Sequence, residues 1–237
     1  MMLVLKKRNL IFATLMFLLV CLLSGAAYRY FSVKTFLPNE GRTVVIDAGH
    51  GAPDGGAVTD GGVEEKDLNL SVALFLQEYF EQSGTNVILT RSDDCGIYEH
   101  ADTIRSKKRS DLKNREKIIK ASGADAVISI HMNEFSESKY SGPQVFYSKN
   151  HESSERLAEL VQTSMNEALV PASARDYKKA GDSIYLLKKA EIPAILVECG
   201  FLSNPEEQQK LLNERYRQQV AWSIYCGAIK YFEEEKS

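Results

Sequence analysis

The chain has 237 residues, of which 44% are hydrophobic and 26% are charged, a composition typical of globular proteins. Residues 1–29 contain four basic residues and no acidic one, so the rest of the chain, with 25 basic and 32 acidic residues, carries a net charge of −7. This acidic balance excludes a basic surface for nucleic acid, and we expect no nucleic-acid partner.

The N-terminal segment has the pattern of a targeting sequence. Lys6-Lys7-Arg8 is basic, residues 10–23 (LIFATLMFLLVCLL) are apolar, and residues 24–27 (SGAA) are the small residues of a cleavage site. The apolar run is shorter than the roughly 20 residues of a membrane span, but it continues towards Phe31 and then suits an uncleaved anchor. We therefore expect residues 1–31 to be a signal peptide or an N-terminal membrane anchor.

The remaining chain predicts one folded domain behind a linker. Residues 32–42 (SVKTFLPNEGR) are polar and contain a proline and a glycine, which is typical of a linker, and the domain is expected over residues 43–235. The hydrophobic pattern predicts strands at 44–46, 87–89, 126–130, 145–147, 184–187 and 194–197, and helices at 65–82, 111–121, 152–168, 205–213 and 215–233. Residues 92–108 are polar and irregular and are expected to form a surface loop.

Strands that alternate with helices indicate an α/β fold. We expect a single three-layer domain with a twisted, mostly parallel sheet and helices on both of its faces. In such open sheets, functional sites lie beyond the carboxyl ends of the strands. His50 follows the apolar run VVID, His131 follows AVISI, and Glu198 follows AILV. If these strands are neighbours, the three side chains converge.

Two histidines and a carboxylate are a ligand set that suits Zn²⁺, and three protein ligands leave a position for water. Hydrolysis of an amide then needs a further carboxylate, which takes a proton from water and passes it to the leaving amine. Glu198 is available for that role. No HExxH or CxxC motif is present, so the ligands would come from distant segments.

Glu65 is a further candidate at the start of a predicted helix, directly after Gly61-Gly62-Val63-Glu64. An acidic residue in the first turn of a helix interacts favourably with the helix dipole. Considered alone, Glu65 is therefore better explained as a helix-capping acid than as a ligand.

Five ordered blocks of sequence resemble one protein family. IDAGHG, GGVEEKDLNLSVAL, ILTRSDD, GADAVISIHMN and ILVECGFLSN are similar to the zinc-dependent N-acetylmuramoyl-L-alanine amidases, and the resemblance covers residues 43–233. The stretch DLKNREKII, ahead of the second histidine block, resembles the germination-specific amidases of the spore cortex.

The resemblance implies hydrolysis of the amide between N-acetylmuramic acid and L-alanine in peptidoglycan, with one Zn²⁺ per chain. It makes His50, Glu65 and His131 the metal ligands and Glu198 the catalytic acid and base. Glu65 then becomes a ligand rather than a cap. Arg115 and Asn133 are expected to contact substrate or to support the ligands.

The subgroup implies a role in spore cortex maturation during sporulation, through muramic-δ-lactam formation, that is needed for later germination. The expected location is outside the cytoplasmic membrane, in the cell wall or the spore cortex space, as a secreted or membrane-anchored protein. The expected partners are peptidoglycan, an activating or targeting protein, and the membrane if residues 1–31 are retained.

Two alternatives remain open at this point. A non-enzymatic wall-binding domain could share the fold, but it would lack a ligand or Glu198. A zinc peptidase that cuts within the stem peptide would use the same ligand set, and only the sequence blocks favour the muramoyl-alanine bond. The basic run Lys107-Lys108-Arg109 is interpreted first as a solvated surface and second as a contact for stem-peptide carboxylates.

Overall fold

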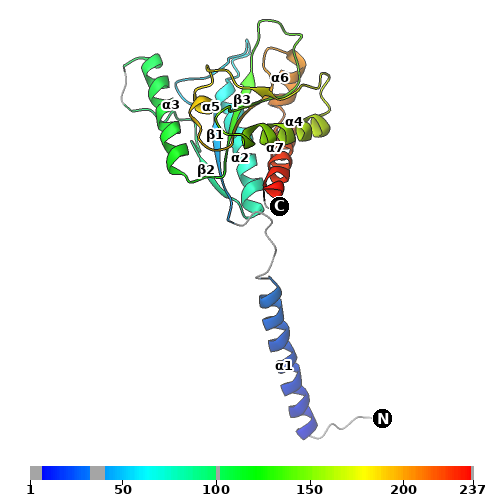
Figure 1. Ribbon diagram of the computed structural model, residues 1–237. Coiled ribbons are helices and arrows are strands. Elements are labelled where there is room, and N and C mark those ends of the chain that lie inside the picture. Colours follow the sequence, from blue (N-terminus) through cyan, green and yellow to red (C-terminus); the bar gives the residue numbers. More distant parts are fainter. Residues whose placement is uncertain (1–6, 33–40, 100–101, 236–237) are drawn as a thin grey trace. The chain divides into compact units, whose positions relative to one another are not determined.

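The structure is a computed structural model that describes residues 7–32, 41–99 and 102–235, and the chain divides into two units, residues 1–38 and 39–237 (Figure 1). The first unit contains helix α1 (Lys7–Ser32), in which residues 11–25 are exposed. Among the residues described with their side chains, no helix is long and apolar enough to cross a membrane. Residues 33–40 of the expected linker lie outside the described residues, and the proposed boundaries stay a prediction.

The second unit is built on a six-stranded sheet with the order β2-β1-β3-β6-β4-β5. Strands β1, β2, β3 and β6 are parallel, while β4 runs antiparallel to β6 and parallel to β5. The strands are β1 (Thr43–Ala48), β2 (Asn86–Leu89), β3 (Ala126–Asn133), β4 (Gln144–Tyr147), β5 (Lys178–Lys179) and β6 (Ala194–Phe201). This arrangement confirms the mostly parallel sheet.

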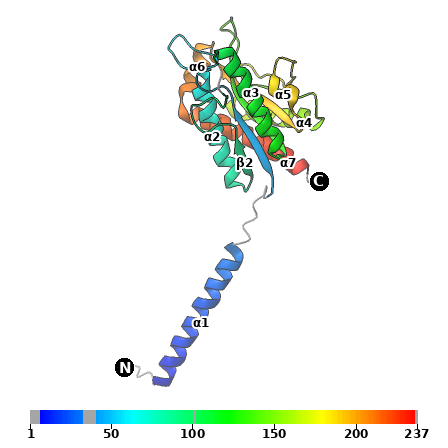
Figure 2. The same cartoon turned by 90° about the vertical axis from the view of Figure 1, so that its left-hand side faces the viewer.

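Helices cover both faces of this sheet. Figure 1 shows α3 on one side of the strands and α4 and α7 on the other, and in Figure 2 α3 lies in front of the strands. The helices are α2 (Glu65–Gln82), α3 (Ile104–Ala121), α4 (Ser153–Leu169), α5 (Tyr185–Lys189), α6 (Pro205–Leu212) and α7 (Glu214–Glu234). One hydrophobic core packs α2, α4 and α7 on the sheet, and a smaller core packs α3 and α5 on it, which confirms the three-layer α/β domain.

The side chains of His131 and Glu198 lie on the face of the sheet that α3 and α5 cover. Val127 of β3 and Leu196 of β6 belong to the core with α3 and α5. Because alternate residues of a strand share a face, His131 lies on the same face as Val127, and Glu198 on the same face as Leu196. His131 and Glu198 are partners in the β3–β6 register. Both strands extend further than predicted, so these two residues lie within the strands rather than after them.

Two predicted elements are wrong. Residues 184–187 form no strand but lead into the short helix α5, because a short apolar run cannot be assigned by periodicity alone. The predicted loop 92–108 ends early, since α3 begins at Ile104 behind a capping box of Thr103 and Ser106. The first two turns of α3 are mostly exposed and polar, so they lack the apolar stripe that predicts a helix.

Candidate active site

The glycines beside His50 make room for the other histidine. His50 follows β1 with φ of 60°, in the left-handed region that non-glycine residues rarely occupy. A side-chain carbon on Gly49 would lie 2.4 Å from atoms of the His131 ring, so only glycine fits there. The GHG sequence therefore brings the two imidazoles together, with ring centroids 5.0 Å apart.

His50, Glu65 and His131 form one cluster, as the family resemblance implied. One ligand atom from each lies within 4.8 Å of the others. Glu65 lies between the rings, with Oε2 3.2 Å from His50 Nε2 and Oε1 2.9 Å from His131 Nδ1. The cluster presents two imidazoles and a carboxylate at the carboxyl end of the sheet, a donor set that could hold a metal ion.

The surroundings of Glu65 fix both of its oxygens. Its side chain accepts hydrogen bonds from the backbone N–H groups of Ala57 (2.9 Å) and Met132 (3.1 Å) and from Asn69 Nδ2 (3.1 Å). Burial alone would raise the pKa of Glu65, but hydrogen bonds from His131 and His50 hold it far below its usual range. Glu65 does lie in the first turn of α2, where an acidic residue suits the helix dipole, but its carboxylate also contacts both histidines, so capping is not its whole role.

Asp54 orients the His50 ring. Its Oδ2 lies 3.0 Å from His50 Nδ1, which leaves Nε2 directed towards Glu65. Burial would lower the pKa of His50, but the hydrogen bonds to Asp54 and Glu65 raise it to about 9. A metal ion at Nε2 would take the place of the proton there, because a histidine ligand must be neutral.

Glu198 is a half-buried residue that lines the same cavity as His50 and His131, and its Oε2 atom is buried. Its Oε2 has no hydrogen-bond partner among the described residues. Burial, assisted by the negative charge of Glu65, raises the pKa of Glu198 to about 7 against the opposing effect of His131. A carboxyl group with a pKa near neutrality can accept a proton and return it, as general acid–base catalysis requires.

The two histidines and Glu198 line a cavity of about 280 Å³. One part of its lining is polar and contains His50, His131 and Glu198, and another part is apolar and contains Leu112 and Ile184. Asn133 is not among the lining residues; its carbonyl accepts a hydrogen bond from the Leu202 N–H at 2.8 Å. Substrate contact by Asn133 stays a prediction.

Arg115 is buried beneath the cavity and holds the backbone that carries His50. Its side chain is 1% exposed. Nη2 donates to the His50 carbonyl at 2.5 Å, and Nη1 donates to the Ala48 carbonyl and to Asp47 Oδ1, both at 2.7 Å. Burial would raise the pKa of Asp47, but Arg115 and a hydrogen bond from Ser129 lower it to about 2. Arg115 thus supports the left-handed turn at His50.

Sequence reasoning missed three further residues of the site: Asp54, Asn69 and Arg91. Arg91 donates to the carbonyls of Ala48 and Gly49, both at 2.9 Å, so two arginines hold this turn. Asn69 could have been found, because it follows Glu65 by four residues and lies on the same helical face. No spacing rule identifies Asp54 or Arg91, which lie in irregular segments.

The sequence matches the family model described as N-acetylmuramoyl-L-alanine amidase over residues 44–230. It is 38% identical over 200 residues to the germination-specific N-acetylmuramoyl-L-alanine amidase of Bacillus subtilis (strain 168), covering 84% of this chain and 83% of that protein. It is also 30% identical to the amidase LytC of the same organism, covering 82% of this chain and 36% of LytC.

Solved structures agree with these matches. The CwlD amidase from Clostridioides difficile, in complex with the GerS lipoprotein, is similar with a TM-score of 0.79 and 42% identity, over 82% of this chain and all of that one. The catalytic domain of the amidase CwlV from Bacillus (Paenibacillus) polymyxa var. colistinus gives a TM-score of 0.69 and 30% identity, over 81% and 98% of the two chains. The chain therefore belongs to the N-acetylmuramoyl-L-alanine amidase family and is an amidase that acts on peptidoglycan.

Proposed function

We propose that this amidase depends on zinc and cuts the bond between N-acetylmuramic acid and L-alanine. His50, Glu65 and His131 hold one Zn²⁺, and Glu198 is the catalytic acid and base. The observation that carries the proposal is the convergence of three ligand atoms within 4.8 Å, near the buried Oε2 of Glu198, which has no hydrogen-bond partner in the described part of the chain.

The residues present fit zinc. Two imidazoles and a carboxylate are ligands that zinc takes in catalytic sites. The supporting contacts are also typical, because a carboxylate on the second nitrogen of a ligand histidine orients the ring and raises its basicity, and Asp54 supplies this for His50. When bound, the ion polarises the scissile carbonyl and lowers the pKa of water.

The remaining steps belong to the protein. Glu198 accepts a proton from the attacking water and delivers it to the nitrogen of the departing alanine, so one carboxyl group acts as base and then as acid. The pKa of about 7 permits both roles near neutral pH. The apolar lining, with Leu112 and Ile184, shields the reacting groups from bulk water.

Replacing either ligand histidine by alanine should remove both the metal and the activity. In His50→Ala or His131→Ala only two of the three ligands remain, so we expect zinc to be lost and turnover to fall to background. Metal content by mass spectrometry and release of stem peptide measure the two effects. His151→Ala, on a histidine outside the cavity, is the control. Full zinc content in His131→Ala would contradict the ligand assignment.

Asp54→Asn should weaken zinc binding without removing it. The amide cannot replace the charge that Asp54 Oδ2 places 3.0 Å from His50 Nδ1, and loss of such a partner lowers metal affinity roughly 10–100-fold. Competition with a calibrated chelator measures the affinity. Asp60→Asn, at an exposed aspartate, is the matched control. Equal zinc affinity in the wild type and Asp54→Asn would rule out this role.

We further propose a role in spore cortex maturation, through muramic-δ-lactam formation, and a location in the cell wall or cortex space. The similarity to a germination-specific amidase supports the role. The complex of the C. difficile relative with a lipoprotein supports an activating or targeting partner for this chain. Spores of a strain that lacks this chain should lose muramic-δ-lactam from the cortex, and normal lactam content would contradict the role.

A further inference from the structure

The cavity has a cationic side chain at its mouth that the proposed reaction does not use. Lys108, in the second turn of α3, lines the cavity together with His50 and Glu198. Its side chain is 51% exposed, and its Nζ lies 2.9 Å from Asp54 Oδ2. Of the basic run that the sequence singled out, Lys108 alone is among the cavity-lining residues described.

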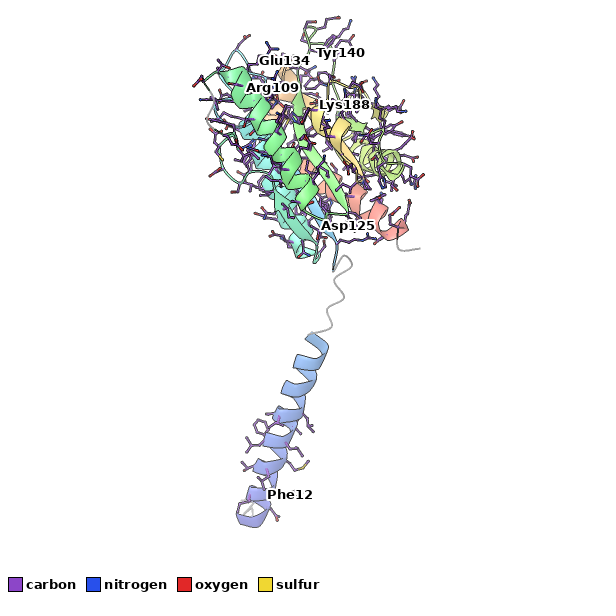
Figure 3. All side chains as sticks on the ribbon, turned by 60° about the vertical axis from the view of Figure 1, so that its left-hand side comes forward. Phe12, Arg109, Asp125, Glu134, Tyr140 and Lys188 are labelled. Carbon is purple, nitrogen blue, oxygen red and sulfur yellow. The ribbon has the colours of Figure 1, made fainter. Side chains whose placement is uncertain are left out.

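The neighbouring basic residues are directed elsewhere. Lys107 places its Nζ 5.1 Å from the centre of the Tyr98 ring, away from the cavity. Arg109 is exposed and does not line the cavity; Figure 3 shows it at the same end of the domain as Glu134, while Asp125 marks the other end. The solvated-surface interpretation fits the exposed Arg109, whereas Lys107 is half-buried against Tyr98 and Lys108 lines the cavity.

The contact with Asp54 fixes the ammonium group without using all of its donors. Lysine has three N–H donors, and Asp54 takes one of them. A long side chain normally loses much rotamer freedom when it binds a ligand. Since the ion pair already holds Lys108 at the cavity, part of that loss precedes substrate binding, and the free donors remain available to an anion.

The substrate carries an anion two residues along the stem peptide from the scissile amide. The scissile amide joins the muramoyl group to L-alanine, and the next residue is a glutamate linked through its side-chain carboxyl, so its α-carboxylate is free. Two residues of extended chain span ~7 Å. Lys108 lies close to the ligand cluster, because Asp54 Oδ2 is 2.9 Å from Lys108 Nζ and 3.0 Å from His50 Nδ1. The apolar lining at Leu112, one turn beyond Lys108 on α3, suits the methyl group of the alanine between them.

We propose that Lys108 is a specificity-determining residue that binds the free α-carboxylate of the second stem-peptide residue. This inference rests on the proposed function, because it places the scissile amide beside Glu198. The contact with Lys108 also orients the bound substrate, so that its stem peptide runs from the cavity along α3. A stem peptide in which that carboxylate is amidated is then bound more weakly.

The test compares binding of two muramoyl tripeptides that differ only in an α-carboxylate or an α-carboxamide on the second residue. All proteins are the zinc-loaded full chain with Glu198→Gln, so that neither ligand is cut. Dissociation constants are measured for this protein and for two further variants of it, one with Lys108→Met and one with Lys113→Met. Lys113 is an exposed lysine of the same helix that does not line the cavity, so Lys113→Met removes the same charge elsewhere.

We expect the carboxylate ligand to bind about fivefold more tightly than the carboxamide, the upper end of what an exposed ion pair contributes. The ratio should persist in Lys113→Met and fall to one in Lys108→Met. The inference would be overturned if Lys108→Met left the ratio of the two dissociation constants unchanged. It would also be overturned if Lys108→Met weakened the binding of both ligands equally, because Lys108 would then only support Asp54. Peptide release by the chain with Glu198 intact reports separately on the proposed function.

Discussion

Glu198→Gln should retain one zinc ion per chain and lose about 10²–10⁴-fold in turnover, the range that general acid–base catalysis contributes. The substitution keeps the size of the side chain and removes its ability to accept the proton of water. Because Glu198 is absent from the His50–Glu65–His131 cluster, metal binding should not depend on it. Zinc content and the initial rate of stem-peptide release are measured on the same preparation.

A matched substitution separates loss of the base from a general disturbance of this cavity. Ser183 also lines the cavity but carries no ionisable group, so Ser183→Ala should retain most of the activity. Glu198→Gln that hydrolyses peptidoglycan at a rate near that of the wild type would refute the assignment of the acid and base. Loss of zinc from Glu198→Gln would instead make Glu198 a ligand.

Arg115→Met should destabilise the domain by about 3–5 kcal/mol, because it leaves the buried carboxylate of Asp47 without its charged partner. For a domain of this size that corresponds to a fall in Tm of roughly 10 °C. The variant also removes the hydrogen bond to the His50 carbonyl, so we expect weaker zinc binding in the protein that remains folded. Thermal unfolding and chelator competition measure the two effects.

Arg115→Lys and Arg109→Met are the informative controls. Lysine keeps the charge but cannot reproduce the planar fork that reaches Asp47 and the His50 carbonyl together, so it should restore only part of the stability. Arg109 is exposed on the same helix, and its removal should shift the Tm little. An Arg115→Met protein with wild-type Tm and zinc affinity would show that the contacts of Arg115 with Asp47 and the His50 carbonyl are not needed for stability or zinc binding.

The sequence predicted the convergence of His50, His131 and Glu198 for a physical reason. The carboxyl ends of parallel strands lie at the same edge of a sheet, and β1, β3 and β6 are consecutive in the sheet order. Glu65 was different, because an acidic residue at a helix start has an ordinary explanation as a cap. Only the resemblance to a family made it a ligand, and the hydrogen bonds around its carboxylate depend on tertiary contacts that no local pattern shows.

The parts that sequence reasoning missed lie where periodicity carries no information. Residues 184–187 are too short for a helix and a strand to be told apart, and the start of α3 has polar residues facing solvent. Asp54 and Arg91 act through contacts between irregular segments. Lys108 lines the cavity from a part of α3, which begins at Ile104, that the polar pattern had assigned to a loop.

If His50, Glu65 and His131 hold the metal that the reaction needs, cleavage of the muramoyl-alanine bond must depend on zinc. To test this, the full chain is incubated with purified peptidoglycan, with zinc or with a chelator, and the products are identified by mass spectrometry. We predict stem peptides with free L-alanine N-termini that appear only with zinc and disappear in Glu198→Gln. Equal release of these peptides in the chelator would show that the enzyme does not need the metal, and products cut within the stem peptide, with the muramoyl-alanine bond intact, would show that it cuts another bond.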